Sequence, residues 1–267
     1  MRSAPTNLVP LHGRSGLALA AVSLIGLVAF GWPFFTQPGT ALDTSHSGDA
    51  PILFVAILPL LAAIVLAELT SGGMDAKSVA MLGMLAAVGG ALRALGPGTA
   101  GLEPSFAVII IGGRVFGRGF GFVLGAVTVF TGALITGGVG PWLPFQMMAA
   151  GWVGFGAGCL PRSGGRAEIA WLAAYAFLSG LLFGVVMNIW FWPFAAYGPE
   201  TSFVAGDPFA ANLGRYTVFY VTTSVLWDLG RSILSVLVIG FAGSALLRAL
   251  RRAGRRAAFD VPVVFDR

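Results

Sequence analysis

The sequence is poor in charged residues and nearly free of lysine, histidine and cysteine. Charged side chains make up 10% of the chain and apolar residues 57%, and the mean hydropathy is +0.86. These values are typical of integral membrane proteins and argue against a soluble domain. The single cysteine, Cys159, excludes an intramolecular disulfide, and we interpret it as an inert thiol near a helix end.

The shortage of titratable groups also restricts the chemistry that the chain could perform. Both histidines, His12 and His46, lie outside the apolar spans, which argues against a bis-histidine haem, a zinc peptidase and a serine–histidine dyad. No two carboxylates stand at helical spacing inside a span, so proton-relay and metal chemistry lack their residues. We therefore predict that the chain is not an enzyme and that it holds no cofactor and no metal.

The chain also lacks a loop for binding the phosphates of ATP. Its only lysine, Lys77, follows Ala76 rather than glycine, so no segment matches the pattern G-x4-G-K-[ST]. If ATP drives transport by this protein, another subunit must therefore hydrolyse it.

Long apolar segments, in contrast, fill most of the chain. A bilayer crossing needs about 20 apolar residues, and we predict eight spans, at residues 16–35, 51–69, 78–95, 104–113, 119–136, 142–160, 169–194 and 216–247. The fourth is short for a crossing. The first could instead be a signal peptide with Arg2 and Arg14 in its basic region, but its length and the segment after it favour a retained anchor.

The distribution of charge predicts how these spans are oriented. Five arginines follow or end the last span, at Arg248, Arg251, Arg252, Arg255 and Arg256. Such a cluster is typical of a cytoplasmic anchor beside the anionic lipid of the bilayer, and we expect no nucleic-acid binding. Because basic residues gather on one side of the predicted spans, we expect a multi-pass protein of the plasma membrane with both termini in the cytoplasm.

The predicted fold is an all-α integral membrane protein with a six-helix bundle and about two additional N-terminal transmembrane helices. Residues 1–76 form an N-terminal extension with two helices, residues 77–250 the six-helix core, and residues 251–267 a basic cytoplasmic tail.

Small residues recur at every fourth position of the third predicted span, at Gly83, Ala87 and Ala91. Such a face allows two helices to approach closely in a membrane. It either packs against another helix of the same bundle or docks onto a separate membrane subunit.

Charged residues in or near the spans are candidates for a binding site, because burying a charge in a membrane is costly. Asp228 and Arg231 stand three residues apart on the last span, so they can pair on one helix face. They form either a structural ion pair or the polar floor of an outward-facing pocket. Arg93 and Glu103 flank a predicted outer loop and either pair across it or contact a ligand.

Neutral polar and aromatic residues extend this candidate pocket. Gln146 and Asn188 lie at membrane depth and can form hydrogen bonds to a ligand. Trp190, Trp192 and Tyr197 stand beside or within a predicted outer loop that extends to residue 215. They belong either to an aromatic belt at the membrane interface or to a pocket for a flat, ring-containing solute that the loop covers.

Several segments give the chain a resemblance to a known family. They are MLGMLAAVGGALRAL, LEPSFAVIIIGGRVFGRGFGFVLGA and GVGPWLPFQMMAAGWVGFGAGCLP, followed by the last span and its basic tail. From about Ser78 to Arg256, the sequence resembles the substrate-binding S components of energy-coupling factor (ECF) vitamin transporters. The resemblance implies a six-helix membrane bundle that binds a vitamin or vitamin precursor from outside the cell.

The resemblance also implies partners and a ligand. It implies association with two cytoplasmic ATPases and docking onto a transmembrane T component through small residues, which here are Gly83, Ala87 and Ala91. The glycine at the first of these positions and the two extra N-terminal spans depart from the family pattern. Within the family the chain looks most similar to the cobalamin-type branch and next to the riboflavin-type branch, so the expected ligand is a corrinoid first and riboflavin second.

Two other functions stand as alternatives. A stand-alone secondary carrier or channel for a small organic solute would need ion-coupling residues, and Asp228 is the only carboxylate deep in a predicted span. A structural membrane scaffold would bind no small molecule at all.

Overall fold

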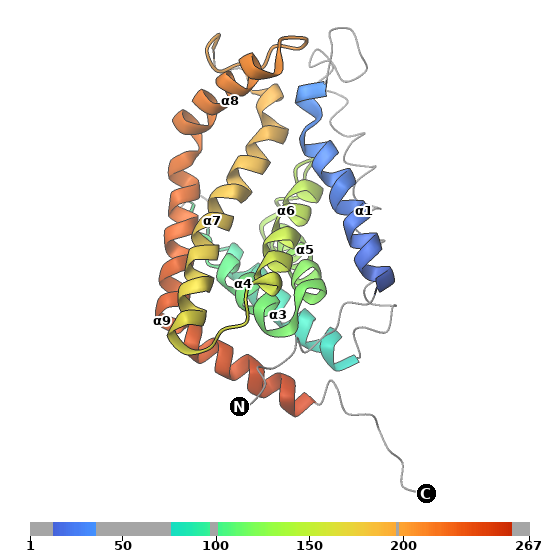
Figure 1. Ribbon diagram of the computed structural model, residues 1–267, viewed down its shortest axis with the longest axis vertical. Coiled ribbons are helices and arrows are strands. Elements are labelled where there is room, and N and C mark those ends of the chain that lie inside the picture. The colour runs from blue at the N-terminus through green and yellow to red at the C-terminus, as the bar shows by residue number, and fades with distance from the viewer. Residues whose placement is uncertain (1–12, 36–75, 97–100, 196–197, 258–267) are drawn as a thin grey trace, which may run out of the picture.

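The structure, a computed structural model, describes residues 13–35, 76–96, 101–195 and 198–257 (Figure 1). In this part of the chain all regular secondary structure is helical. The α-helices are α1 (Gly13–Phe30), α3 (Ala76–Arg93), α4 (Ser105–Phe116), α5 (Arg118–Thr136), α6 (Leu143–Cys159), α7 (Gly165–Phe191), α8 (Phe209–Thr223) and α9 (Val225–Ala257). Two short 3-10 helices, η1 (Trp32–Phe35) and η2 (Trp192–Phe194), follow α1 and α7.

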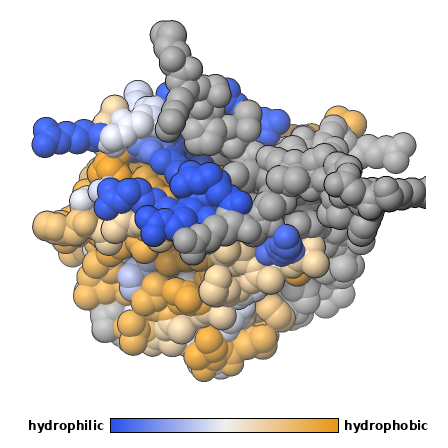
Figure 2. Space-filling model, turned by 90° about the horizontal axis from the view of Figure 1, so that it is seen from below, coloured by the Kyte–Doolittle hydropathy of each residue, from blue (hydrophilic) through white to orange (hydrophobic). Residues whose placement is uncertain are grey.

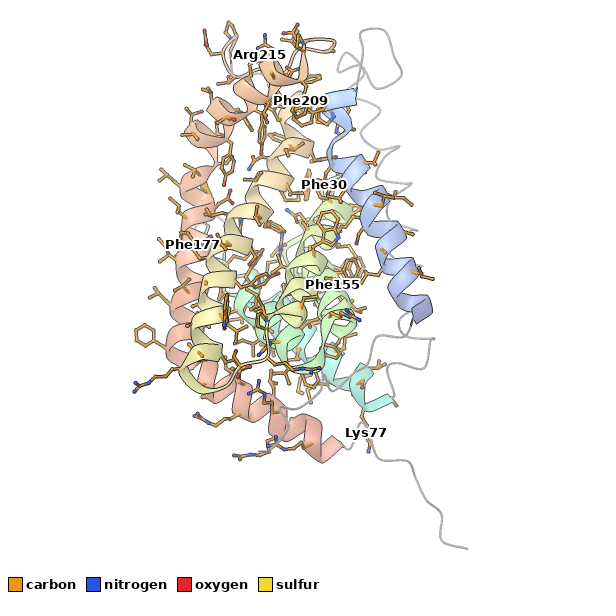
Figure 3. The ribbon with its side chains drawn as sticks, in the orientation of Figure 1. Phe30, Lys77, Phe155, Phe177, Phe209 and Arg215 are labelled. Carbon is orange, nitrogen blue, oxygen red and sulfur yellow. The ribbon has the colours of Figure 1, made fainter. Side chains whose placement is uncertain are left out.

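Four helical segments of the described chain are long and apolar enough to cross a membrane, namely α3, α5, α7 together with η2, and α9. Residues Leu19–Phe30 of α1 and the whole of α4 are apolar but shorter. Side chains project outward along α1 and α9 (Figure 3), and the large apolar residues Leu24, Leu182 and Phe241 are among those exposed. Soluble proteins rarely expose so much apolar surface, and these features are those of a membrane protein.

The centre of the bundle is α4, which contacts α3, α5, α6, α7 and α9. All of its residues except Val108 and Arg114 are buried. A helix that neighbouring helices enclose does not itself have to cover the full thickness of the lipid. This position explains why the fourth predicted span is short.

Glycine and proline set the helix boundaries close to the predicted ones. Gly117 separates α4 from α5 with a φ of 113°, and Gly137 ends α5 with a φ of 68°. Residues other than glycine rarely adopt such positive φ angles. Pro144 stands in the first turn of α6, where its missing N–H costs no helical hydrogen bond.

The prediction of one continuous last span at residues 216–247 is wrong, because the chain is divided at Ser224 into α8 and α9. Ser224 has a φ of −126°, outside the helical range, and its hydroxyl donates a hydrogen bond of 2.9 Å to Asn188 Oδ1 on α7. The backbone N–H of Ser224 still donates to the Tyr220 carbonyl at 3.0 Å, so α8 and α9 join through a local change of backbone angle. The span predicted at residues 51–69 lies outside the described residues.

The two ends of the bundle differ in charge. One end, which we call the basic end, holds Lys77, Arg114 and Arg251 and is the lower end in Figure 3. Hydrophilic residues gather there and are bordered by apolar surface (Figure 2). The opposite end holds the partly exposed ion pair between Arg215 and Asp207.

Helices α5 and α6 pack with their backbones in direct contact. A Cβ atom added at Gly154 of α6 would collide with the carbonyl group of Gly121 on α5, and one added at Gly125 would collide with the backbone of Ala150. Only glycine permits such an approach, which is a common way for membrane helices to associate. Gly121 and Gly125 of α5, spaced four residues apart, therefore allow close helix packing inside the bundle.

We predict that Gly154→Ala destabilises the bundle by about 1–3 kcal/mol, because the added methyl group forces the two backbones apart. Gly83→Ala is the matched control, since no described atom lies within 4 Å of a Cβ added there. Thermal unfolding of the detergent-purified variants, followed by tryptophan fluorescence, should show a lower midpoint for Gly154→Ala alone. Equal midpoints would contradict the close contact between α5 and α6.

Candidate functional site

Five residues that the sequence predicts for a binding site meet at one place in the bundle. They come from the end of α3, the segment before α4, the first turn of α6 and the first turns of α9. We call them the polar cluster: Arg93, Glu103, Gln146, Asp228 and Arg231.

Glu103 is the centre of the polar cluster, because it pairs with both arginines. Arg93 Nη1 donates to its Oε1 at 2.7 Å and Arg231 Nε donates to its Oε2 at 3.2 Å. Arg231 Nη1 also donates to Asp228 Oδ1 at 2.5 Å, and Arg93 Nη2 donates to Gln146 Oε1 at 2.7 Å. Two arginines thus balance two carboxylates, which lowers the cost of burying these charges in the membrane.

Residues that sequence reasoning missed hold Arg231 in place. The guanidinium carbon of Arg231 lies 5.3 Å from the ring centroid of Phe106 and 4.9 Å from that of Phe183. Both distances allow a cation–π interaction. Neither phenylalanine carries a local signal, because each is one more apolar residue in an apolar span, and only the packing of α4, α7 and α9 brings them to the arginine.

A cavity of about 230 Å³ lies beside the polar cluster. Three of its lining side chains, Arg93, Glu103 and Arg231, are 18%, 14% and 13% exposed. A small molecule in the cavity can therefore reach donors for a carboxylate or phosphate group and an acceptor for an amine or amide. The other lining residues are Gly96, Gly101, Thr136 and Trp227.

Gly101 shows why glycine is required at the wall of this cavity. Its φ is 80°, and a Cβ added to it would collide with the carbonyl group of Trp227 on α9. The segment before α4 therefore lies directly on α9, which brings Glu103 within reach of Arg231.

The predicted residue Asn188 lies on α7 outside this cavity lining. Its side-chain amide donates to the Gly184 carbonyl at 2.8 Å, and its oxygen accepts the hydrogen bond from Ser224. The first contact orients the Asn188 side chain on α7, and the second joins it to the junction between α8 and α9. The predicted residue Tyr197 lies outside the described residues.

The two predicted tryptophans belong to packed aromatic groups. Trp190 is buried, with its ring centroid 4.8 Å from that of Phe145 and 6.0 Å from that of Phe194. Trp192 is buried as well, and its ring centroid lies 5.4 Å from that of Tyr216. Neither tryptophan is among the residues that line the cavity beside the polar cluster.

The predicted docking residues share one exposed face of α3. Gly83, Ala87 and Ala91 are all exposed, and so are the neighbouring apolar residues Met84 and Val88. Within the described part of the chain, no helix covers this face. It is a shallow apolar surface on which another helix could pack closely.

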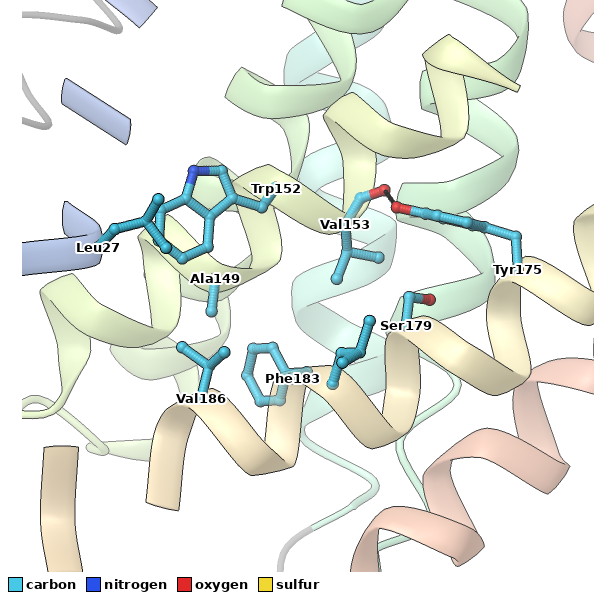
Figure 4. A pocket seen from close by; sticks show the side chains of 9 residues that line it. Leu27, Ala149, Trp152, Val153, Tyr175, Ser179, Phe183 and Val186 are labelled. Atoms are coloured by element: carbon cyan, nitrogen blue, oxygen red, sulfur yellow. Dashed lines mark hydrogen bonds between the residues drawn. The ribbon is translucent and has the colours of Figure 1, made fainter. Parts of the chain in front are cut away.

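A second cavity, of about 250 Å³, lies between α1, α6 and α7 (Figure 4). Its walls are mainly apolar, and Trp152 forms one of them. The Tyr175 hydroxyl donates to the Val153 carbonyl at 2.7 Å, and the Ser179 hydroxyl donates to a backbone carbonyl at 3.4 Å. Because both polar groups already have partners, this cavity offers little to orient a polar ligand.

A second buried ion cluster, which we call the basic-end triad, also escaped sequence reasoning. Glu168 at the start of α7 has a side chain only 3% exposed, and it accepts hydrogen bonds from Arg114 Nε at 2.7 Å and Arg251 Nη2 at 2.5 Å. Arg114 also donates to the Leu160 carbonyl at 2.9 Å. The available signal was a single acidic residue in an otherwise basic segment before an apolar span.

Comparisons with known proteins do not identify the chain. No known protein family, no curated protein and no solved structure matches it. Among the described residues, no group of three or more His, Cys, Asp or Glu side chains could hold a metal ion. A proposal about function therefore depends on the residues of the chain and their geometry.

We predict that Glu103→Gln lowers the free energy of unfolding by about 3 kcal/mol, because it leaves Arg93 and Arg231 without their shared counter-charge. Asp207→Asn is the matched control, since it breaks a pair with Arg215 whose side chains are 34% and 26% exposed. Such a partly exposed pair at the surface contributes about 0–1 kcal/mol. Thermal unfolding in detergent should separate the two variants, and similar losses would show that Glu103 does not link two buried charges.

Proposed function

We propose that the chain is the substrate-specific S subunit of an ECF-type, ATP-driven importer, and that it captures a vitamin or vitamin precursor from outside the cell. The observation that carries the proposal is the convergence of Arg93, Glu103 and Arg231 on one cavity, with Gln146 and Asp228 paired behind them. Polar groups that are fixed in position, as these are by their ion pairs, can orient a small molecule in its site. The resemblance of the sequence to S components supports the same function.

The proposed partners are a transmembrane T component and two cytoplasmic ATPases. The chain has no phosphate-binding loop, so it needs partners that hydrolyse ATP. The exposed face of Gly83, Ala87 and Ala91 supports docking of α3 onto the T component, because small residues let two membrane helices approach closely.

The proposal includes a six-helix core at residues 77–250, two further membrane helices within residues 1–76, and a location in the plasma membrane. It places the basic end and both termini in the cytoplasm, as the excess of arginine there favours. On an ideal helix, Arg231 and Arg251 are separated by about 30 Å, which is about the thickness of the hydrocarbon core. The polar cluster then lies near the outer surface of the membrane.

The proposed ligand is a corrinoid, with riboflavin as the second choice, on the strength of the resemblance. The cavity of about 230 Å³ is smaller than the range of about 300–1,000 Å³ that is usual for ligand sites. The proposal therefore includes widening of this cavity when a large planar vitamin binds.

We predict that the detergent-purified chain, expressed alone, retains or binds a cobalamin or a flavin at close to one molecule per chain. The absorption spectrum and mass spectrometry of the denatured extract identify the ligand. Thr136→Trp should abolish binding because the indole ring fills the cavity. Ile135→Trp is the matched control, because its exposed side chain does not line the cavity. An empty chain that also binds no added vitamin would overturn the proposal.

We further predict that Gly83→Leu and Ala87→Leu stop vitamin uptake but leave ligand binding by the purified chain unchanged, because a bulky residue obstructs the docking face and not the cavity. Met84→Leu on the same helix conserves volume and should retain uptake. Uptake is measured in cells that contain the complete transporter. Full uptake by both bulky variants, or loss of uptake when only the proton gradient is collapsed at constant ATP, would contradict the proposed partners.

A further inference from the structure

A cavity at the basic end has no part in the proposed capture of a vitamin. It lies between α7 and α9 and measures about 660 Å³. Its lining combines three arginines, one carboxylate and an apolar wall: Arg166, Arg248, Arg251, Glu168, Gly165, Ile169, Ala170, Ala173, Gly240, Ser244 and Leu247.

Positive charge exceeds negative charge in this cavity, and two of its three arginines form no ion pair with a described residue. Glu168 is almost fully buried and already paired with Arg114 and Arg251 in the basic-end triad. Arg166 and Arg248 are exposed and form no ion pair with any residue that the structure describes. The cavity therefore presents two unpaired guanidinium groups beside a third whose position Glu168 fixes.

The beginning of α7 adds hydrogen-bond donors to the same place. Gly165 lines the cavity, and no side chain caps the N-terminus of the helix. The first backbone N–H groups of a helix have no helical partner, and the helix dipole makes this end attractive to anions. Charge and donor groups thus point to a ligand with a phosphate or another oxyanion.

The apolar wall distinguishes a lipid from a soluble anion. Ile169 and Ala173 on α7 face Gly240 and Leu247 on α9 across the cavity, and both helices are long and apolar enough to cross a membrane. The neighbouring Phe241 is almost fully exposed, so this side of α9 faces hydrocarbon in a bilayer. A free phosphate would contact only the arginines, whereas a phospholipid would contact both parts of the cavity.

We propose that the cavity is a binding site for one phospholipid with an anionic headgroup. The headgroup phosphate binds Arg166, Arg248 and the N-terminus of α7, and an acyl chain lies along the apolar wall between α7 and α9. Basic pockets between membrane helices at a cytoplasmic surface are suited to such headgroups. The site is independent of the vitamin and of the polar cluster.

The test uses the full-length chain in detergent and dioleoylphosphatidylglycerol as the probe. Binding to the folded state should raise the thermal unfolding midpoint as lipid is added. Dioleoylphosphatidylcholine, which has the same acyl chains but a choline cation that balances the charge of its phosphate, should raise it much less. Arg166→Gln combined with Arg248→Gln should weaken the apparent affinity about 30-fold. Arg252→Gln combined with Arg255→Gln is the matched control, because it removes the same charge from exposed positions outside the cavity lining.

A second variant tests the proposed position of the acyl chain along the apolar wall. Gly240→Leu fills the apolar part of the cavity and keeps every arginine, and no described atom lies within 4 Å of a Cβ added there. It should weaken binding of phosphatidylglycerol without lowering the midpoint measured in the absence of lipid. The proposal would be overturned if both double arginine variants lost the same affinity for phosphatidylglycerol. It would also be overturned if phosphatidylcholine or inorganic phosphate stabilised the chain as much as phosphatidylglycerol does. None of these measurements requires the vitamin, so they succeed or fail independently of the proposed transport function.

Discussion

The structure of the bundle depends on its central helix, α4. This helix lies in apolar surroundings and has a charged residue at each end. Glu103 precedes α4 and pairs with Arg231, whereas Arg114 in its last turn pairs with Glu168. A buried charge without a partner is far more costly than a paired one, so the neighbouring helices must supply counter-charges at both ends. Helix α9 reaches both places, because Arg251 joins Glu168 at the basic end. These two clusters therefore fix the positions of α4, α7 and α9 along the bundle.

The sequence left two interpretations of Asp228 and Arg231, a structural ion pair or the polar floor of a pocket, and the polar cluster combines them. Asp228 and Arg231 form an ion pair that stabilises the bundle, and Arg231 also lines the cavity. A ligand with a carboxylate could replace Glu103 as the partner of an arginine, and a ligand with an amine could replace Arg231 as the partner of Glu103. Glu103 is shared by two arginines and Arg231 by two carboxylates, so each keeps a charged partner in these exchanges, and a structural cluster of this kind can also bind a charged solute.

Sequence patterns predicted what depends on near neighbours and missed what depends on packing. The all-helical membrane class follows from composition, helix ends follow from glycines such as Gly117, and the pair of Asp228 with Arg231 follows from their spacing on one helix. The bond between Arg231 and Glu103 joins residues 128 positions apart, so no local pattern marks it. Residues 216–229, around the division of the last span at Ser224, contain neither glycine nor proline, so no local pattern marks that interruption either.

Close contact between α7 and α9 has a mechanical consequence. Gly180 of α7 lies against Ser232, and Gly184 lies against Asp228, with no room for a methyl group at either glycine. Rotating one helix about its axis would drive these side chains into the backbone of the other, and tightly packed interiors resist such overlap. These contacts therefore oppose rotation of α7 against α9 and favour movement of the two helices as one unit. Any tilt that displaces Arg231 at one end also displaces the arginines about 30 Å away at the other end.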